Sequence, residues 1–207
     1  MTIKYIIFDL GGVLINIDFD KTFEAYGKLS GMTKDELQQA TFMTRAYEEY
    51  ESGSLTDHDF RNELRQRLNI KHNDQDIDQA WNALLLDFNP PSIEILKEIR
   101  TRYPVYLLSN TNNIHFERCN TKIKEQNLAE SLTSLFDGLF LSYRIGYRKP
   151  SDQIYLHAIK RLKCRPNEIL FIDDLKVNID AAENLGIQTL HLTDNKKIKE
   201  QLLERLN

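Results

Sequence analysis

The sequence has few cysteines and no clustered metal ligands. Only Cys119 and Cys164 occur among 207 residues, and neither has a partner at CxxC spacing. Two such cysteines cannot form a disulfide framework, so we expect both to be free thiols. The five histidines are scattered without metal-ligand spacing, which argues against a zinc site. These absences exclude a fold stapled by disulfides or by zinc.

The sequence also lacks an excess of positive charge and a long apolar run. It has 27 Lys and Arg against 31 Asp and Glu, a net charge of -4, whereas domains that bind a nucleic acid duplex are usually basic. No apolar run approaches the ~18 residues of a membrane span, and the N-terminus does not resemble a secretory signal. We therefore expect a cytoplasmic monomer or weak homo-oligomer, with no nucleic acid or membrane partner.

The sequence does contain short apolar stretches that alternate with helical patterns. The stretches are nearly continuous in apolar residues, which is typical of parallel strands covered on both faces. They lie at residues 4–9, 105–110, 138–142, 168–173 and 187–192. Strand and helix in alternation predict an α/β fold with a doubly wound, Rossmann-like parallel sheet.

The stretch from residue 17 to 88 departs from that alternation. It has no convincing strand, but it has helix-like segments for which Thr33, Thr56 and Asp76 are candidate N-caps. We therefore expect a helical cap (17–88) inserted into an α/β core (1–16 and 89–207). A crevice between two such units is a favoured place for a ligand.

Within the expected cap, the segment RAYEEYES places four residues at helical spacing: Arg45, Tyr47, Glu48 and Glu51. We interpret them mainly as a solvated or packed helix face. The alternative is that some of them face the crevice. The aromatic residues of this region are expected to form the cap's own core; they are Phe23, Tyr26, Phe42, Phe60, Trp81 and Phe88.

Polar residues lie at or just beyond the ends of four predicted strands. They are Asp9 in FDLGGVL, Ser109 and Asn110 in LLSNTN, Lys149 in GYRKP, and Asp173 and Asp174 in FIDDLKVN. Because ligands of an open parallel sheet collect beyond the carboxyl ends of its strands, we expect these side chains to share one site. Taken singly, each also fits a structural role, such as a turn former or a surface lysine.

Three carboxylates at one site predict a bound cation, because they repel one another unless a cation holds them together. Oxygen ligands without histidine or thiolate favour a hard ion such as Mg²⁺. A lysine and a serine hydroxyl beside Mg²⁺ supply the charge and hydrogen bonds that a phosphoryl group needs. A carboxylate among them is a candidate nucleophile. The pattern therefore predicts phosphoryl transfer from a small phosphorylated metabolite.

The order and spacing of four segments resemble the motifs of the haloacid dehalogenase (HAD) superfamily of phosphohydrolases. The segments are FDLGGVL, LLSNT, RKP and FIDDLKVNIDAA. The resemblance covers essentially the whole chain, since the helical insertion is similar to the family's cap. The DLGG start, the phrase YEEYESGSLTDHDF and LSNTN are most similar to bacterial sugar-phosphate phosphatases of the glucose-1-phosphatase type.

The resemblance implies a catalytic centre built on Asp9. Asp9 would attack phosphorus and form an aspartyl-phosphate, which water then cleaves. Asp174, with Asp9 and the backbone carbonyl of Gly11, would hold Mg²⁺. Asp173 would orient the metal's surroundings.

The resemblance also implies how the phosphoryl group is bound. Ser109 and Lys149 would bind its oxygens and take part in catalysis, and the amide of Asn110 would support them.

Gly11 departs from the family pattern. Most phosphatases of the family carry a second aspartate at this position, and its acid/base service is ordinarily worth about 100-fold or more. Either the leaving group needs little help, as the anomeric hydroxyl of a sugar 1-phosphate does, or another residue such as Asp18 or a cap residue supplies the proton. A catalytically weak binding or regulatory protein and a metal-independent dehalogenase remain alternatives.

Overall fold

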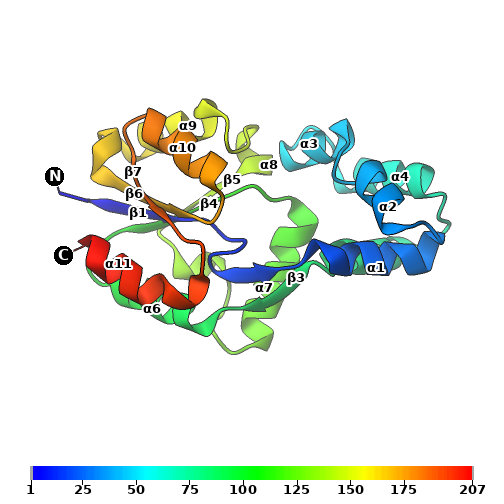
Figure 1. The fold of residues 1–207 in the computed structure, drawn as a ribbon, viewed down its shortest axis with the longest axis horizontal. Helices are drawn as coiled ribbons and strands as arrows, with labels where there is room; N and C mark the ends of the chain where they lie inside the picture. Colours follow the sequence, from blue (N-terminus) through cyan, green and yellow to red (C-terminus); the bar gives the residue numbers. More distant parts are fainter. Residues whose placement is uncertain (1, 207) are drawn as a thin grey trace.

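The fold is built around a five-stranded parallel sheet (Figure 1). The computed structural model describes residues 2–206. The strands are β1 (Tyr5–Phe8), β4 (Val105–Ser109), β5 (Gly138–Leu141), β6 (Ile169–Asp173) and β7 (Gln188–His191). Every pairing between them is parallel. Each strand lies within one of the predicted stretches, so the prediction of an α/β parallel sheet is confirmed.

The strand order places β1 at the topological switch point of the sheet. The order is β5-β4-β1-β6-β7, so β1 lies between β4 and β6. The chain leaves β1 toward one side first and crosses to the other side later, and ligands bind at such a reversal. Asp9 follows directly on β1 and therefore lies where the fold favours a site.

Helices cover both faces of the sheet (Figure 1). On one face lie α9 (Asp152–Leu162) and α10 (Lys176–Asn184), and on the other lie α6 (Pro90–Arg100), α7 (Asn113–Glu125) and α11 (Ile198–Leu206). Ile7 packs into the apolar cluster of α9 and α10, while Ile6 and Phe8 pack into the opposite cluster. This is why the strand is continuously apolar: its side chains alternate between two buried layers.

Helices also make up most of the segment between β1 and α6. They are α1 (Phe19–Ser30), α2 (Lys34–Ala40), α3 (Arg45–Glu51), α4 (Asp57–Leu68) and α5 (Asp74–Asn82). They share an apolar cluster of their own around Tyr26 and Trp81. Thr33 and Thr56 cap α2 and α4 as predicted. Asp76 is not a cap; α5 begins earlier, and the side chain of Asn73 accepts a hydrogen bond from the backbone N–H of Asp76.

A two-stranded antiparallel sheet at the base of this helical segment corrects the prediction of no strand. It pairs β2 (Ile15–Ile17) with β3 (Leu85–Phe88). Such short strands have no visible period in the sequence, and they form because the two ends of the insertion meet. Phe88 packs into the cluster beneath the main sheet and not into the cap's core. The boundaries at 17 and 88 fall within this pair, and the division into cap and core stays a prediction.

The remaining elements are short helical segments. A short helix, α8 (Ser142–Ile145), follows β5, and the 3-10 turns are η1 (Thr133–Leu135), η2 (Pro166–Glu168) and η3 (Asn195–Lys197). Both cysteines are free, as expected. Within residues 2–206, no helix combines the length and the apolar character needed to cross a membrane.

Candidate active site

The turn after β1 brings Asp9 close to the end of β6. The backbone N–H of Asp9 donates to the carbonyl of Ile172 at 2.9 Å, which continues the pairing of the two strands. Gly12 has a φ of 72°, and a Cβ there would overlap the carboxylate of Asp174. Only glycine combines this left-handed backbone with so close an approach. The glycine turn therefore lets two acidic strand ends share one small space.

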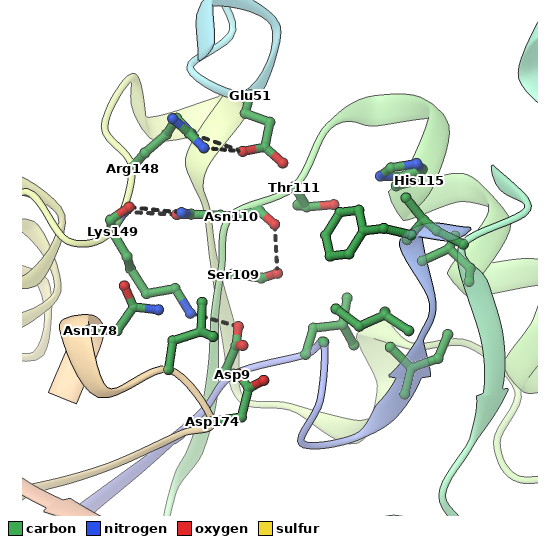
Figure 2. Close-up of a pocket in the computed structure, with 18 of the residues that line it drawn as sticks. Asp9, Glu51, Ser109, Asn110, Thr111, His115, Arg148, Lys149, Asp174 and Asn178 are labelled. Atoms are coloured by element: carbon green, nitrogen blue, oxygen red, sulfur yellow. Dashed lines mark hydrogen bonds and ion pairs between the residues drawn. The ribbon is translucent and has the colours of Figure 1, made fainter. Parts of the chain in front are cut away.

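Lys149 lies between Asp9 and Asp173, and Figure 2 shows its contact with Asp9. Its Nζ is 2.6 Å from Oδ1 of Asp9 and 2.6 Å from Oδ2 of Asp173, and all three side chains are buried. Burial alone would lower the pKa of Lys149, but the two carboxylates raise it above its ordinary value. The lysine is therefore a fixed positive charge at the end of the sheet.

Asp173 and Asp174 have different surroundings although they are adjacent. Oδ1 of Asp173 accepts from the backbone N–H of Leu175 at 2.8 Å and from Nδ2 of Asn178 at 3.0 Å. Asp173 is thus held entirely by the protein. Asp174 is only partly buried and lies with Asp9 on the pocket side. Asn178, in the first turn of α10, therefore positions Asp173.

The acidic cluster fits a divalent cation. Asp9, Asp173 and Asp174 offer oxygen atoms that lie within 4.8 Å of one another. Burial, together with Asp173 and Asp174, raises the pKa of Asp9 to about 7 in spite of the lowering effect of Lys149. Burial and Asp173 likewise raise the pKa of Asp174. One lysine against three carboxylates leaves negative charge in excess, and oxygen donors alone suit Mg²⁺.

Ser109 and Asn110 lie at the end of β4 and connect it to the loop that carries Lys149. Nδ2 of Asn110 donates to the carbonyl of Lys149 at 2.8 Å, and the backbone N–H of Lys149 donates to Oδ1 of Asn110 at 2.7 Å. The side-chain amide of Asn110 is therefore engaged in placing Lys149. Ser109 Oγ donates to the carbonyl of Asn110 at 3.3 Å, a long bond that a phosphoryl oxygen could replace.

These side chains open onto one pocket of about 340 Å³. Of the predicted site residues, Asp9, Gly11, Ser109, Asn110, Lys149 and Asp174 line it. Asp173 is fully buried behind Lys149. The opposite wall is apolar and comes from β2, the start of α1, the segment after α2 and the approach to β3; it consists of Ile15, Ile17, Phe19, Phe42, Leu84 and Leu85. The structure thus brings the predicted residues together, while their individual roles stay predictions.

The pocket also contains an ion pair between buried Glu51 and partly exposed Arg148, which the sequence analysis did not predict. Glu51 of α3 accepts from Nε and Nη2 of Arg148, each at 2.8 Å, and from the hydroxyl of Tyr47 at 3.0 Å. Glu51 is buried and lines the pocket together with Tyr47, which supports the alternative that some residues of this helix face the crevice. Burial raises its pKa, and Arg148 and Tyr47 partly offset that effect. The available signal was the position of Arg148 directly before Lys149, since the two must share one loop.

Gly11 lines the pocket and has no side chain that could serve as an acid or base there. A Cβ there would lie 3.3 Å from Cδ1 of Ile17. Asp18, the alternative proton donor, instead caps α1 by accepting from the backbone N–H of Asp20 at 3.0 Å, and it is not among the residues that line the pocket. The Asp18 alternative is therefore not supported by its position.

Known proteins resemble this chain over nearly its whole length. A family model described as a haloacid dehalogenase-like hydrolase matches residues 3–186. The chain is 31% identical over 206 residues to D-ribitol-5-phosphate phosphatase of Bacteroides thetaiotaomicron, covering 99% of each. It is 26% identical to a sesquiterpene phosphatase of Aspergillus oryzae, covering 94% of this chain and 92% of that protein.

Solved structures show the same architecture. A HAD family enzyme from Bacteroides thetaiotaomicron, in complex with magnesium and inorganic phosphate, matches with a TM-score of 0.82 at 31% identity, over 91% of this chain and 93% of that one. A HAD-like family hydrolase from Porphyromonas gingivalis matches with a TM-score of 0.88 at 27% identity, over 100% and 98%.

Proposed function

The chain belongs to the haloacid dehalogenase-like hydrolases, and from this premise we propose that it is a magnesium-dependent phosphomonoester hydrolase acting on a small phosphorylated metabolite. The observation that supports this most is the position of Lys149 between Asp9 and Asp173, beyond the carboxyl ends of β1, β4 and β6. A positive charge beside an acidic cluster suits a phosphoryl group and a metal together.

In the proposed reaction Asp9 is the nucleophile. An oxygen of Asp9 forms a bond to phosphorus as the bond from phosphorus to the alcohol oxygen breaks, and the leaving oxygen takes its proton from water, because no acid side chain stands at Gly11. Water then attacks phosphorus, releases inorganic phosphate and regenerates the Asp9 carboxylate. Lys149 and Ser109 stabilise the charge on the transferring oxygens. Mg²⁺, held by Asp9, Asp174 and the carbonyl of Gly11, would supply Lewis-acid stabilisation of the same charge.

We extend the proposal to sugar and polyol phosphates as the first substrates to test. The support is the relative that acts on D-ribitol-5-phosphate and matches over 99% of this chain. Gly11 adds a reason to include sugar 1-phosphates, because an anomeric hydroxyl is more acidic than an ordinary alcohol and leaves with less help from an acid.

The test is phosphate release from a panel of sugar, polyol and other metabolite phosphates. We expect release in the presence of Mg²⁺, background release with a chelator, and background release from Asp9→Asn, which keeps the size of the side chain but removes its nucleophilic charge. Circular dichroism of the variant controls for folding. Equal release by Asp9→Asn and the native protein would contradict the assignment of Asp9.

Gly11 favours one alternative, a protein that binds phosphate compounds and turns them over weakly. Metal-dependent binding of inorganic phosphate without turnover of any compound in the panel would support that alternative. A metal-independent dehalogenase is the weaker candidate, because the cluster of Asp9, Asp173 and Asp174 has no use without a cation. Halide release that survives a chelator would support it.

A further inference from the structure

We call the part of the pocket lined by Asp9, Ser109, Lys149 and Asp174 its phosphate end. In the rest of the pocket, the charges of the lining side chains cancel one another. Among the lining residues, only Glu51 and Arg148 are charged in that part. Their side chains are joined at 2.8 Å, and Figure 2 shows the pair across the pocket from Asp9 and Asp174. Arg148 also stacks over the ring of Tyr47, 5.2 Å from its centre. The guanidinium is therefore already engaged on its charged edge and on one face.

The rest of that part of the pocket is uncharged. The apolar wall around Phe42 and Leu85 offers no polar atoms from its side chains. His115 lies against it, and burial lowers the pKa of this histidine to about 4, so the ring is neutral at physiological pH. Its Nε2 is 3.1 Å from the carbonyl of Trp81, and its ring stacks on the Trp81 ring. Thr111 also lines this part of the pocket and carries no charge.

Lys149 cannot serve a second anion at the far end. Its Nζ is held between Asp9 and Asp173, next to the place where a transferring phosphoryl group would bind. The described part of the pocket therefore has no uncompensated cation outside its phosphate end.

We propose that the pocket selects phosphomonoesters whose alcohol portion is uncharged and rejects those that carry a second anionic group; this rests on the proposed function. A second carboxylate or phosphate would lose its water on entering the pocket, find no free cation, and face the carboxylate of Glu51. A neutral polyol or an apolar alcohol meets none of these costs. Glu51 is thereby a specificity-determining residue that acts by occupying Arg148.

The test uses two substrates that differ by one charge: D-ribitol-5-phosphate, and the corresponding aldonate phosphate, in which a carboxylate replaces the terminal hydroxymethyl group. For the native protein we expect kcat/KM at least about tenfold lower with the aldonate. Pentyl phosphate and its ω-carboxylate form a second pair with an apolar remainder. Equal kcat/KM within each pair would overturn the inference and leave the proposed function standing.

The variant Glu51→Gln isolates the role of the ion pair. It keeps the shape of the side chain and releases the charge of Arg148, so the aldonate should gain about tenfold in kcat/KM relative to the polyol, mainly through KM. Glu48→Gln is the matched control, because Glu48 is exposed and lies 3.9 Å from Nη1 of Arg148; it should leave the preference unchanged.

Two outcomes would count against the inference, and a third would leave the comparison of the native protein's substrates to decide. A gain in Glu48→Gln equal to that in Glu51→Gln would show that overall charge, and not the pair of Glu51 and Arg148, sets the preference. If Glu51→Gln does not fold, the native comparison decides by itself. If the native protein hydrolyses none of the four compounds or the wider panel, the proposed function fails and the inference fails with it.

Discussion

At the scale of single residues, the state of Asp173 depends on its neighbours. Asn178 reaches back from α10 and donates to both carboxylate oxygens of Asp173, at 3.0 and 3.1 Å. The backbone carbonyl of Asn178 accepts from the hydroxyl of Tyr155 at 2.9 Å, which fixes the main chain at this residue. This chain of bonds orients Asp173 toward Lys149 and leaves Asp174 free for the pocket.

We therefore expect Asn178→Ala to lower kcat/KM by about 10- to 100-fold, as loss of an outer partner of a metal site commonly does. The loss should be largest at limiting Mg²⁺, because Asp173 and Asp174 would no longer be held apart. Steady-state kinetics over a range of Mg²⁺ concentrations measures this effect. Asn178→Asp adds a fourth carboxylate and should lower kcat/KM further than Asn178→Ala. An unchanged dependence on Mg²⁺ in both variants would contradict the role assigned to Asn178.

The predictable part of the site consists of polar residues that follow buried apolar runs. Asp9, Lys149 and Asp174 were predicted to share a site because each lies at or beyond the end of a predicted strand, where ligands of an open parallel sheet collect. Glu51 was named only among four residues of one helix, some of which could face the crevice, because its partner Arg148 is 97 residues away along the chain. Spacing within one helix carries no information about such a distant partner. The sequence therefore predicts the chemical end of the pocket better than the end that receives the alcohol.

At the scale of elements, the turn between β1 and β2 depends on backbone geometry. Gly12 and Gly31 both have left-handed φ values, 72° and 76°. A Cβ at Gly12 would overlap Asp174, whereas at Gly31, which ends α1, it would meet nothing within 4 Å. Substituting Gly31 would therefore cause backbone strain alone, whereas substituting Gly12 would cause the same strain and a steric overlap with Asp174.

We expect Gly12→Ala to abolish magnesium-dependent phosphate release and Gly31→Ala to retain it. Both substitutions introduce a side chain at positive φ, which costs about 1 kcal/mol of stability, but only the first displaces an acidic side chain. Urea unfolding and phosphate release, measured on both variants, test this. Normal activity in Gly12→Ala would mean that Asp174 does not have to keep its observed position.

Elements were predictable where they were long or fully buried. Strands β1, β4, β5 and β6 were found because both of their faces contribute to buried clusters, and β7 was found from its apolar stretch although its residues are only partly buried. β2 and β3 were not, since strands of three and four residues show no period, and their pairing depends on where the insertion starts and ends. The start of α5 was misplaced at Asp76 because several polar residues precede it and each could cap a helix.

At the scale of the whole molecule, polar contacts tie the helical segment to the helices of the sheet. Nδ2 of Asn113 donates to Asp57 at 2.8 Å, and His115 bonds the carbonyl of Trp81 at 3.1 Å. A Cβ at Gly53 would overlap the carbonyl of Tyr143, so the turn after α3 rests directly on backbone of α8. These contacts fix the position of the helical segment, which forms one wall of the pocket, relative to the sheet, which forms the other.

His115 predicts how this arrangement responds to acid. Burial lowers its pKa from 6.5 to about 4. Between those values the unfolded chain binds a proton that the folded protein does not, so the free energy of unfolding should fall as the pH decreases from 6.5 to 4. The full decrease in the free energy of unfolding is about 3 kcal/mol. Urea unfolding across this pH range measures it.

His115→Gln provides the comparison, because glutamine can still donate toward Trp81 but does not titrate. We expect the variant to be less stable at pH 7, since the ring stacking is lost, and to lose less stability than the native protein on acidification. Parallel pH profiles for the two proteins would contradict a neutral, buried His115 as the titrating group.

The pocket draws its two ends from separate parts of the chain. The phosphate end comes from strand-end loops of the sheet, while the apolar wall and Glu51 come from β2, the helical insertion and the approach to β3. Changes that accumulate in the insertion can therefore alter which alcohol is accepted while the reacting groups stay as they are. In evolutionary terms, this separation lets descendants of one gene acquire new substrates without first losing the reaction.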